Sequence, residues 1–189
     1  MAVAAWHDAG VDDRALVDAV LDGDREAFRA IVDRSQGAVY RACLRVLGSV
    51  PDAEDAAQES FVTAFRSLGS YRGDGPLQAW LVRIATRHAF RRQAQRRSTT
   101  GLDRAVHHVS AAGDDPLAVT IAGERSAVIR SLVAALDEPY REVVALRYFG
   151  ELTLEEVAQA TGRPLNTIKT QVRRGLQRLA ADVGAETIR

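Results

Sequence analysis

The sequence predicts an all-α protein made of two small helical domains joined by a flexible linker. Apolar residues recur at three- and four-residue spacing through most of the 189 residues, and no useful stretch alternates as a strand would. Aromatic residues make up only 6%, so the core must consist mainly of Ala, Val, Leu and Ile, of which Ala and Leu favour helices. The periodicity lapses after residue 97 and resumes at "ERSAVIRSLVAAL". We therefore expect a domain at 11–97, a flexible linker at 98–122 and a domain at 123–182.

Four helices are expected in the first domain, bounded by residues that commonly cap helices. The first follows Asp12 or Asp13 and ends near Gly23, and the second ends at Gly48. Pro51 sits where the third can start, with acidic residues in its first turn. The loop "GSYRGDGP" separates it from a fourth helix that begins "LQAWLV". The face of the third helix expected to be buried consists of Ala57, Phe61, Ala64, Phe65 and Leu68.

The second domain is expected to end in a helix-turn-helix. Thr153 and Glu156 have the spacing of a capping box. Ala158, Gly162 and Ile168 then have the spacing of a close helix contact, a left-handed turn and a locking aliphatic. The face of the last helix expected to point inward consists of Leu165, Ile168, Val172, Leu176 and Leu179. The side chains of its other face, which can bond base edges or phosphates in a major groove, are Thr167, Lys169, Thr170, Gln171, Arg173 and Arg174.

Charge is segregated along the chain although the formal net charge is zero. Acids outnumber bases from Met1 to Trp80, whereas the segment from Arg83 to Arg97 holds six arginines and no acid. The segment 163–179 likewise holds five basic residues and no acid. Two basic patches on an otherwise acidic chain predict two contacts with a polyanion. A solvated basic face on an ordinary helical hairpin is the alternative for the second patch.

Several classes of function lack the residues that they require. Cys43 is the only cysteine, so a disulfide framework and a cysteine-based zinc site are excluded. We find no Gly-rich phosphate loop, paired His-carboxylate motif or nucleophile elbow, and we expect no enzyme activity, cofactor or metal. No signal peptide is visible, and no apolar run approaches the ~18 residues of a membrane span. These features predict a cytoplasmic protein without membrane insertion.

Two segments carry a family resemblance. "DAEDAAQESFVTAFRSLGSYRGDGPLQAWLVRIA" resembles the second conserved region of bacterial sigma factors of the extracytoplasmic-function (ECF) group of the sigma-70 family. "LDEPYREVVALRYFGELTLEEVAQATGRPLNTIKTQVRRGLQRL" resembles their fourth region, and the order and spacing also match. The resemblance implies a transcription initiation factor that binds core RNA polymerase and directs it to promoters. It also implies that an anti-sigma factor is a further partner.

The resemblance assigns three surfaces to this chain. The surface that would dock on the clamp helices of the largest polymerase subunit, here called the acidic face, comprises Asp52, Asp55, Gln58, Glu59 and Val62. The loop 67–77 and the helix after it would hold the non-template strand of the −10 element through Tyr71, Arg72, Arg83, Arg87 and Arg91. The −35 element would be bound by the recognition face, which comprises Thr167, Lys169, Thr170, Gln171, Arg173 and Arg174.

A stand-alone helix-turn-helix transcriptional regulator is the alternative function. It would explain the C-terminal domain alone and would leave the acidic helix and the patch at 83–97 without a role. Tight binding of duplex DNA without polymerase would favour this alternative, and detectable turnover would be needed to favour an enzyme.

Overall fold

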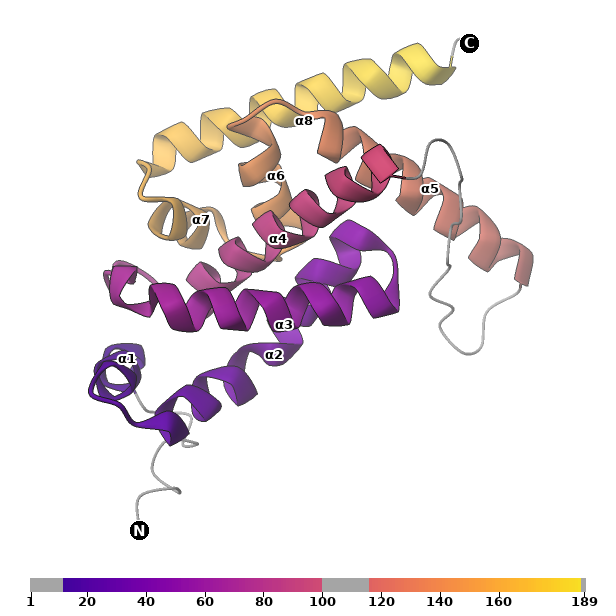
Figure 1. The fold of residues 1–189 in the computed structure, drawn as a ribbon. Coiled ribbons are helices and arrows are strands. Elements are labelled where there is room, and N and C mark those ends of the chain that lie inside the picture. The colour runs from indigo at the N-terminus through magenta and orange to yellow at the C-terminus, as the bar shows by residue number, and fades with distance from the viewer. Residues whose placement is uncertain (1–11, 100–115, 188–189) are drawn as a thin grey trace.

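The computed structural model describes residues 12–99 and 116–187, and within these ranges the chain forms eight α-helices and one short 3-10 turn, with no strand. This confirms the predicted all-α class, and Figure 1 shows the helices in chain order. No helix in the described part of the chain is both long and apolar enough to cross a membrane. The same residues contain no group of three or more His, Cys, Asp or Glu that could hold a metal ion.

The N-terminal unit consists of α1 (Asp13–Leu21), α2 (Arg25–Leu47), α3 (Val50–Ser67) and α4 (Leu77–Thr99). Helices α2, α3 and α4 pack mutually, with α1 against α2. Asp12 caps α1, and Gly48 ends α2 in a left-handed conformation at φ 67°, as the sequence predicted. Small side chains let the helices approach closely, because the fully buried residues include Ala27, Ala30, Ala42, Ala53, Ala56, Ala64, Ala85 and Ala89.

The expected buried face of α3 is wrong at Phe65. This side chain is 52% exposed and meets Phe28 edge-on, with ring centroids 4.9 Å apart. The buried stripe of α3 instead runs through Ala53, Ala56, Ala57, Ser60 and Ala64. Because α3 lies close to both α2 and α4, only small residues fit along that stripe, and the bulky ring is turned toward the edge.

The C-terminal unit consists of α5 (Pro116–Ala135), α6 (Tyr140–Tyr148), α7 (Leu154–Thr161) and α8 (Leu165–Thr187). The centre of the expected linker, 100–115, lies outside the described residues. Helix α4 continues to Thr99 and α5 begins at Pro116, so helical backbone resumes before "ERSAVIRSLVAAL". Proline in the first turn favours a helix start because its φ is already helical and its missing N–H is not needed there.

The inward face of α8 passes through a glycine. Ile168 is fully buried and Val172 nearly so, but Leu176 is 39% exposed, contrary to expectation. Gly175 is buried in its place, and a Cβ there would lie 2.7 Å from Val144 Cγ2 of α6. Local sequence patterns do not explain a glycine inside this helix. The structure supplies a reason, because α8 crosses α6 at this point without room for a side chain.

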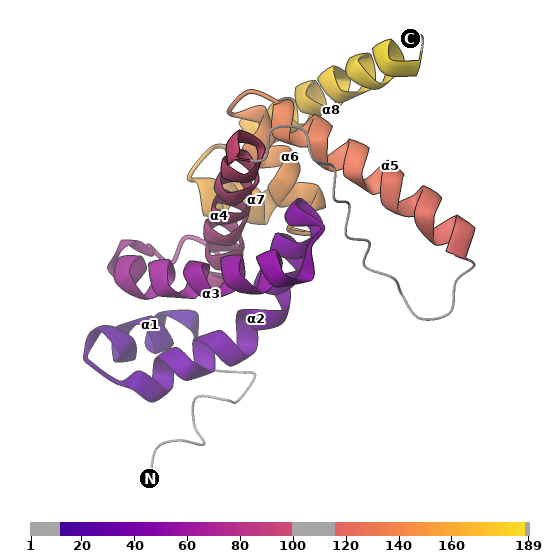
Figure 2. The same cartoon turned by 45° about the vertical axis from the view of Figure 1, so that its right-hand side comes forward.

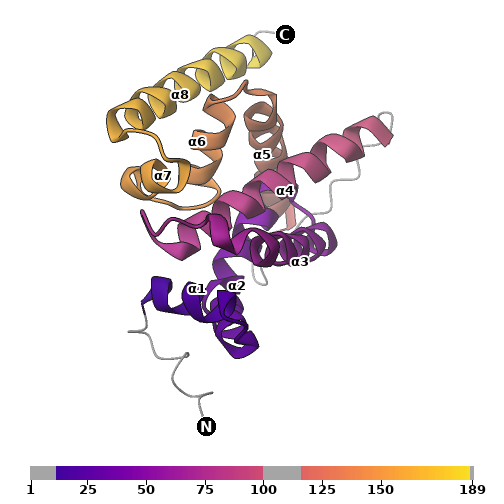
Figure 3. The same cartoon turned by 60° about the vertical axis from the view of Figure 1, so that its left-hand side comes forward.

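The two units are packed against each other. Helix α4 contacts α6 and α7, and α2 contacts α5; Figures 2 and 3 show α4 lying between α2–α3 and the helices of the C-terminal unit. Buried residues of both units form one continuous hydrophobic cluster. The approach is close at Gly150, between α6 and α7, where a Cβ would lie 2.7 Å from Val82 Cγ1 of α4.

Replacing Gly175 by alanine should destabilise the protein by about 1–3 kcal/mol, although alanine is the better helix former, because the added methyl overlaps Val144. Gly37 is the matched control, since a Cβ there meets only the end of the flexible Arg41 side chain at 3.1 Å. Gly37→Ala should therefore be neutral or stabilise by up to about 1 kcal/mol. Urea unfolding of the two variants measures the difference, and equal stability would contradict the close α6–α8 crossing.

Candidate nucleic-acid interface

The helix-turn-helix is built from α7, a tight turn and α8. Thr153 accepts a hydrogen bond from Glu156 N at 3.1 Å, and Thr153 N donates to Glu156 Oε2 at 2.7 Å, which confirms the capping box. Gly162 ends α7 in the left-handed conformation at φ 68°. Ile168 is fully buried, so it fixes α8 against the rest of the unit. The recognition helix is therefore held rigidly at its N-terminal end.

The recognition face is largely open to solvent. Lys169, Arg173, Arg174 and Thr167 are exposed, while Thr170 is half-buried and its hydroxyl donates to Asn166 O at 2.9 Å. Gln171 differs from the others, because its Oε1 is buried and no described residue hydrogen-bonds to it. Four of the six predicted side chains are therefore exposed on α8, where they can reach the major groove of DNA.

The acidic face lies on α3 and is covered in part by arginines of α4. Arg92 donates to Asp55 at 2.7 Å and lies 3.4 Å from carboxylate oxygens of both Asp52 and Glu59. Arg96 also pairs with Asp52. Gln58 is exposed, and Val62 is 51% exposed, so the predicted mixture of carboxylates and an open aliphatic is present. Any basic partner of this face meets carboxylates that already have an internal cation.

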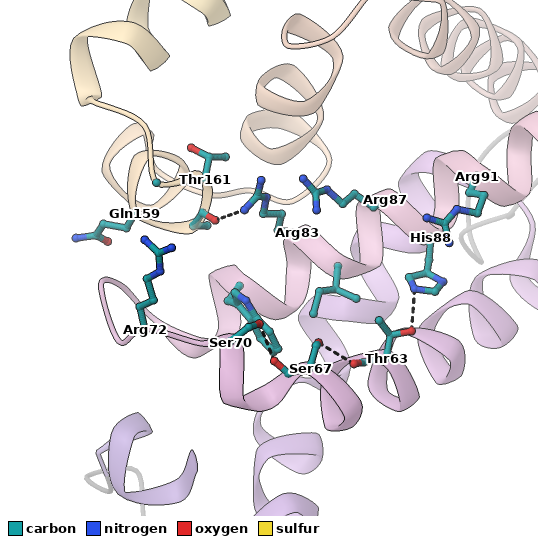
Figure 4. A pocket seen from close by; sticks show the side chains of 14 residues that line it. Thr63, Ser67, Ser70, Arg72, Arg83, Arg87, His88, Arg91, Gln159 and Thr161 are labelled. Carbon is teal, nitrogen blue, oxygen red and sulfur yellow. Dashed lines mark hydrogen bonds between the residues drawn. The ribbon is translucent and has the colours of Figure 1, made fainter. Parts of the chain in front are cut away.

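An arginine-lined cleft of about 710 Å³ lies where α3 and α4 face α7. Figure 4 shows its side chains, including Arg72, Arg83, Arg87 and Arg91. No carboxylate is among the lining residues, which otherwise are Thr63, Ser67, Ser70, Trp80, Ile84, His88, Gln159, Ala160, Thr161 and Gly162. We call this site the arginine cleft. A concave surface with four guanidinium groups and several hydroxyls suits a phosphate-bearing ligand.

Tyr71, the fifth residue predicted at this site, does not line the cleft. Its ring is 7% exposed and meets Trp80 at 5.9 Å between centroids. Its hydroxyl donates to Gly75 O at 2.5 Å, which closes the loop on itself. In this structure Tyr71 shapes the loop, and its contact with DNA stays a prediction.

A cluster around Glu142 of α6 joins the two units. Arg83 and Arg87 of α4 donate to Glu142 Oε1 at 2.9 and 3.0 Å, and Arg163 donates to Oε2 at 2.6 Å. We call these four residues the Glu142 cluster. The Glu142 side chain is 8% exposed. Burial would raise the pKa of its carboxyl, but the hydrogen bond from Arg83 and the charges of the three arginines lower it below the ordinary 4.5.

Two further contacts cross between the units nearby. Arg83 also donates to Ala160 O at 2.8 Å. Arg45, at the end of α2, donates to Phe149 O at 3.1 Å and to Glu151 Oε1 at 2.5 Å. None of these partners was anticipated from the sequence. One sequence signal could have indicated that Glu142 has a cationic partner. It directly precedes the apolar run Val143–Leu146, with which it is buried, and buried acids are rarely unpaired.

Comparison with known proteins places these features in one family. Residues 31–99 match the profile described as Sigma-70 region 2, and residues 126–179 match Sigma-70, region 4. The chain is 33% identical over 169 residues to ECF RNA polymerase sigma factor SigW of Bacillus subtilis, covering 85% of this chain and 90% of that protein. It is 30% identical to ECF RNA polymerase sigma-E factor of Salmonella typhimurium, covering 85% and 88% of the two chains.

A solved structure has the same overall arrangement. The structure of CnrH in complex with the cytosolic domain of CnrY aligns with a TM-score of 0.58 and 25% identity, covering 92% of this chain and 97% of that one. The sigma factor RpoE of Bartonella quintana, in complex with the anti-sigma factor NepR, shares the fold at 20% identity and a TM-score of 0.53, covering 80% and 93%.

The family profiles and the SigW match show that the chain belongs to the ECF group of the sigma-70 family. Its N-terminal unit carries region 2 and its C-terminal unit carries region 4. It is therefore a transcription initiation factor that directs RNA polymerase to promoters, and it is not an enzyme.

Replacing Arg92 by alanine should lower the free energy of unfolding by about 1–2 kcal/mol, because three carboxylates on α3 lose their shared cation. Arg91→Ala is the matched control, since Arg91 is exposed and lies one residue away on the cleft side of α4. Thermal unfolding of both variants measures the effect. Equal stability of the two would show that the contacts of Arg92 contribute nothing in solution.

Proposed function

We propose that the acidic face docks on the clamp helices of the largest polymerase subunit, while the arginine cleft holds the −10 non-template strand and the recognition face binds the −35 element. The observation that carries this proposal is the distribution of charge over separate elements. The acidic face is on α3, the cleft arginines are on α4 and its preceding loop, and Lys169, Arg173 and Arg174 are on α8. Each surface has the residue types that its proposed partner needs.

The acidic face suits a basic, partly apolar coiled coil. Asp55 and Glu59 are exposed along one side of α3, and Val62 extends the same side by one turn. Basic side chains of a partner helix would compete with Arg92 for these carboxylates, and its apolar residues would cover Val62. Charge complementarity of this kind mainly sets the association rate and the orientation of docking.

Regulation by an anti-sigma factor and a cytoplasmic location complete the proposal. RpoE has been solved with the anti-sigma factor NepR, and CnrH has been solved with the cytosolic domain of CnrY. Support for a comparable partner here comes from the likeness of the whole chain to CnrH, which covers 92% of this chain at a TM-score of 0.58. A cytoplasmic location follows from the proposed function, because chromosomal promoters and RNA polymerase are in the bacterial cytoplasm.

The proposal is tested by mixing the protein with bacterial core RNA polymerase and genomic DNA. We expect the two to co-elute and to start transcripts at discrete sites that core enzyme alone ignores, with a shared motif in the −10 and −35 positions. Absence of co-elution, combined with tight duplex binding by the protein alone, would instead support the stand-alone regulator.

Substitutions should separate the two kinds of surface. Lys169→Ala or Arg173→Ala should weaken promoter binding by the holoenzyme by about 1–3 kcal/mol while leaving core binding intact, if these side chains read base edges. Asp55→Ala with Glu59→Ala should weaken core binding instead, as measured by the affinity of labelled protein for core enzyme. Gln177→Ala, exposed on α8 outside the recognition face, is the control and should change neither. The reverse pattern would show that the surfaces are wrongly assigned.

A further inference from the structure

We propose that Asp13, at the start of α1, positions the loop 67–77 and the first turn of α4 for the −10 strand without contacting DNA itself. This inference rests on the proposed function of the arginine cleft and adds a positioning residue on which that site depends. Asp13 is not among the residues that line the cleft, and α1 carries none of the three surfaces assigned above. Its effect is exerted through the backbone that carries Arg72 and Arg83.

The first support is a hydrogen bond between distant segments. Leu77 is the first residue of α4, and its backbone N–H donates to Asp13 Oδ2 at 2.7 Å. The first N–H groups of a helix have no acceptor within the helix, and the helix dipole favours a negative charge beside them. Pro76, the residue before α4, has no side-chain oxygen that could act as a local cap. Asp13 therefore caps α4 from 64 positions away.

The second support is that the Asp13 carboxylate is itself fixed in place. Arg34 of α2 donates to Asp13 Oδ1 at 3.1 Å, so both carboxylate oxygens accept hydrogen bonds. The side chain of Asp13 is only 27% exposed. One turn further along α1, Leu16 and Val17 are buried in the core and anchor the helix. The acceptor for α4 is therefore in position before DNA binds.

The third support is that the loop lies against α1 and closes on itself. The 3-10 turn η1 (Leu68–Ser70), which opens the loop, contacts α1. Burial, and after it the charge of Asp13, raises the pKa of Tyr71 to about 12, so the Tyr71 hydroxyl stays protonated and donates to Gly75 O. Arg72 follows Tyr71 and lines the cleft (Figure 4). With the loop closed at Tyr71 and fixed at its end by Asp13, Arg72 has little freedom to move.

Two physical effects of removing Asp13 have opposite signs, which makes the inference testable. Without its acceptor, the start of α4 samples more conformations, and strand binding then has to order it at a cost in free energy. Apparent affinity falls with the fraction of molecules whose loop is in place. Removing one negative charge should instead strengthen phosphate binding by general electrostatics. Weaker strand binding after loss of the carboxylate therefore indicates positioning.

The test compares variants bound to core polymerase, with DNA from a start site mapped with the wild-type protein. One probe is a fluorescein-labelled non-template single strand that spans the −10 position. The other is a duplex that carries the −35 position and ends upstream of −10. Asp13→Ala removes the acceptor, whereas Asp13→Asn keeps a carbonyl oxygen. Asp12→Ala is the matched control, because it removes the same charge and the cap of α1 but leaves the bond to Leu77.

We expect Asp13→Ala to bind the −10 strand about three- to tenfold more weakly than wild type, in proportion to the loss of correctly placed loops. Asp13→Asn should stay within about twofold of wild type, because Asn and Asp are equally good caps. Asp12→Ala should also stay within about twofold. All three should bind core enzyme and the −35 duplex as wild type does, whereas a general loss of stability would lower every affinity together.

A second pair of variants keeps the test valid if Asp13→Ala fails to fold. Arg34→Gln removes the ion pair that holds Asp13. Arg29→Gln removes the same charge at an exposed position of the same helix. Arg34→Gln should bind the −10 strand at least about twofold more weakly than Arg29→Gln, because only Arg34 orients the acceptor.

Strand binding by Asp13→Ala that equals or exceeds that of wild type would overturn the inference. An equal loss in Asp12→Ala would overturn it too, because the effect would then come from the stability of α1. Equal strand binding by Arg34→Gln and Arg29→Gln would likewise contradict it. The proposed function fails separately, if the wild-type protein does not associate with core enzyme or does not direct it to discrete start sites.

Discussion

A buried carboxylate, that of Glu142, joins the two halves of this protein. Three guanidinium groups converge on Glu142, two from α4 and one from the turn of the helix-turn-helix. Without the carboxylate these cations would repel one another, and the two units could not close at this point. Taking the charges out of water costs free energy that the ion pairs offset only when their geometry is good. Such a contact therefore specifies an arrangement more than it stabilises one.

Helix α4 supplies side chains both to the arginine cleft and to the ion pairs with the acidic face, and helical periodicity separates these two sets. Arg83, Arg87 and Arg91 recur every four residues, so they share one face and line the arginine cleft. Arg92 and Arg96 also lie four residues apart and point to the carboxylates of α3. A third set of positions on α4 is apolar and buried, as Val82, Ala85 and Ala89 show. A run of arginines that looks uniform in the sequence is thus divided into two groups with different partners.

Much of the fold follows from local sequence signals. The helix caps and the helix-turn-helix spacing depend only on residues that are close in the chain, so they can be predicted from local sequence. The caps are Asp12, Gly48, Thr153 and Gly162. The exposed side of α3 was equally predictable, because charged residues at helical spacing cannot be buried together. The family resemblance supplied the order of the regions and predicted which surfaces bind polymerase and DNA.

The features that escaped prediction all depend on contacts between distant segments. Phe65 has the right spacing for a core residue, but the space between α2, α3 and α4 admits only small side chains. Leu176 is more exposed than predicted, and Gly175 is buried beside it because α8 crosses α6 at the glycine. The Glu142 cluster joins residues separated by 21 to 59 positions. No local pattern encodes which arginines a buried acid will meet once two domains are packed.

The distance between the two units, measured in the free protein and in the polymerase complex, tests most directly whether the two units bind the separate −10 and −35 elements. Dyes can be placed by Asp22→Cys, at the C-cap of α1, and by Gln177→Cys on α8, both exposed positions, because burial raises the pKa of the native Cys43 to about 12 and leaves it unreactive. We expect efficient energy transfer in the free protein and a marked loss on addition of core polymerase and promoter DNA. Unchanged transfer in a complex that initiates transcription would contradict the assignment of the −10 and −35 elements to separate units.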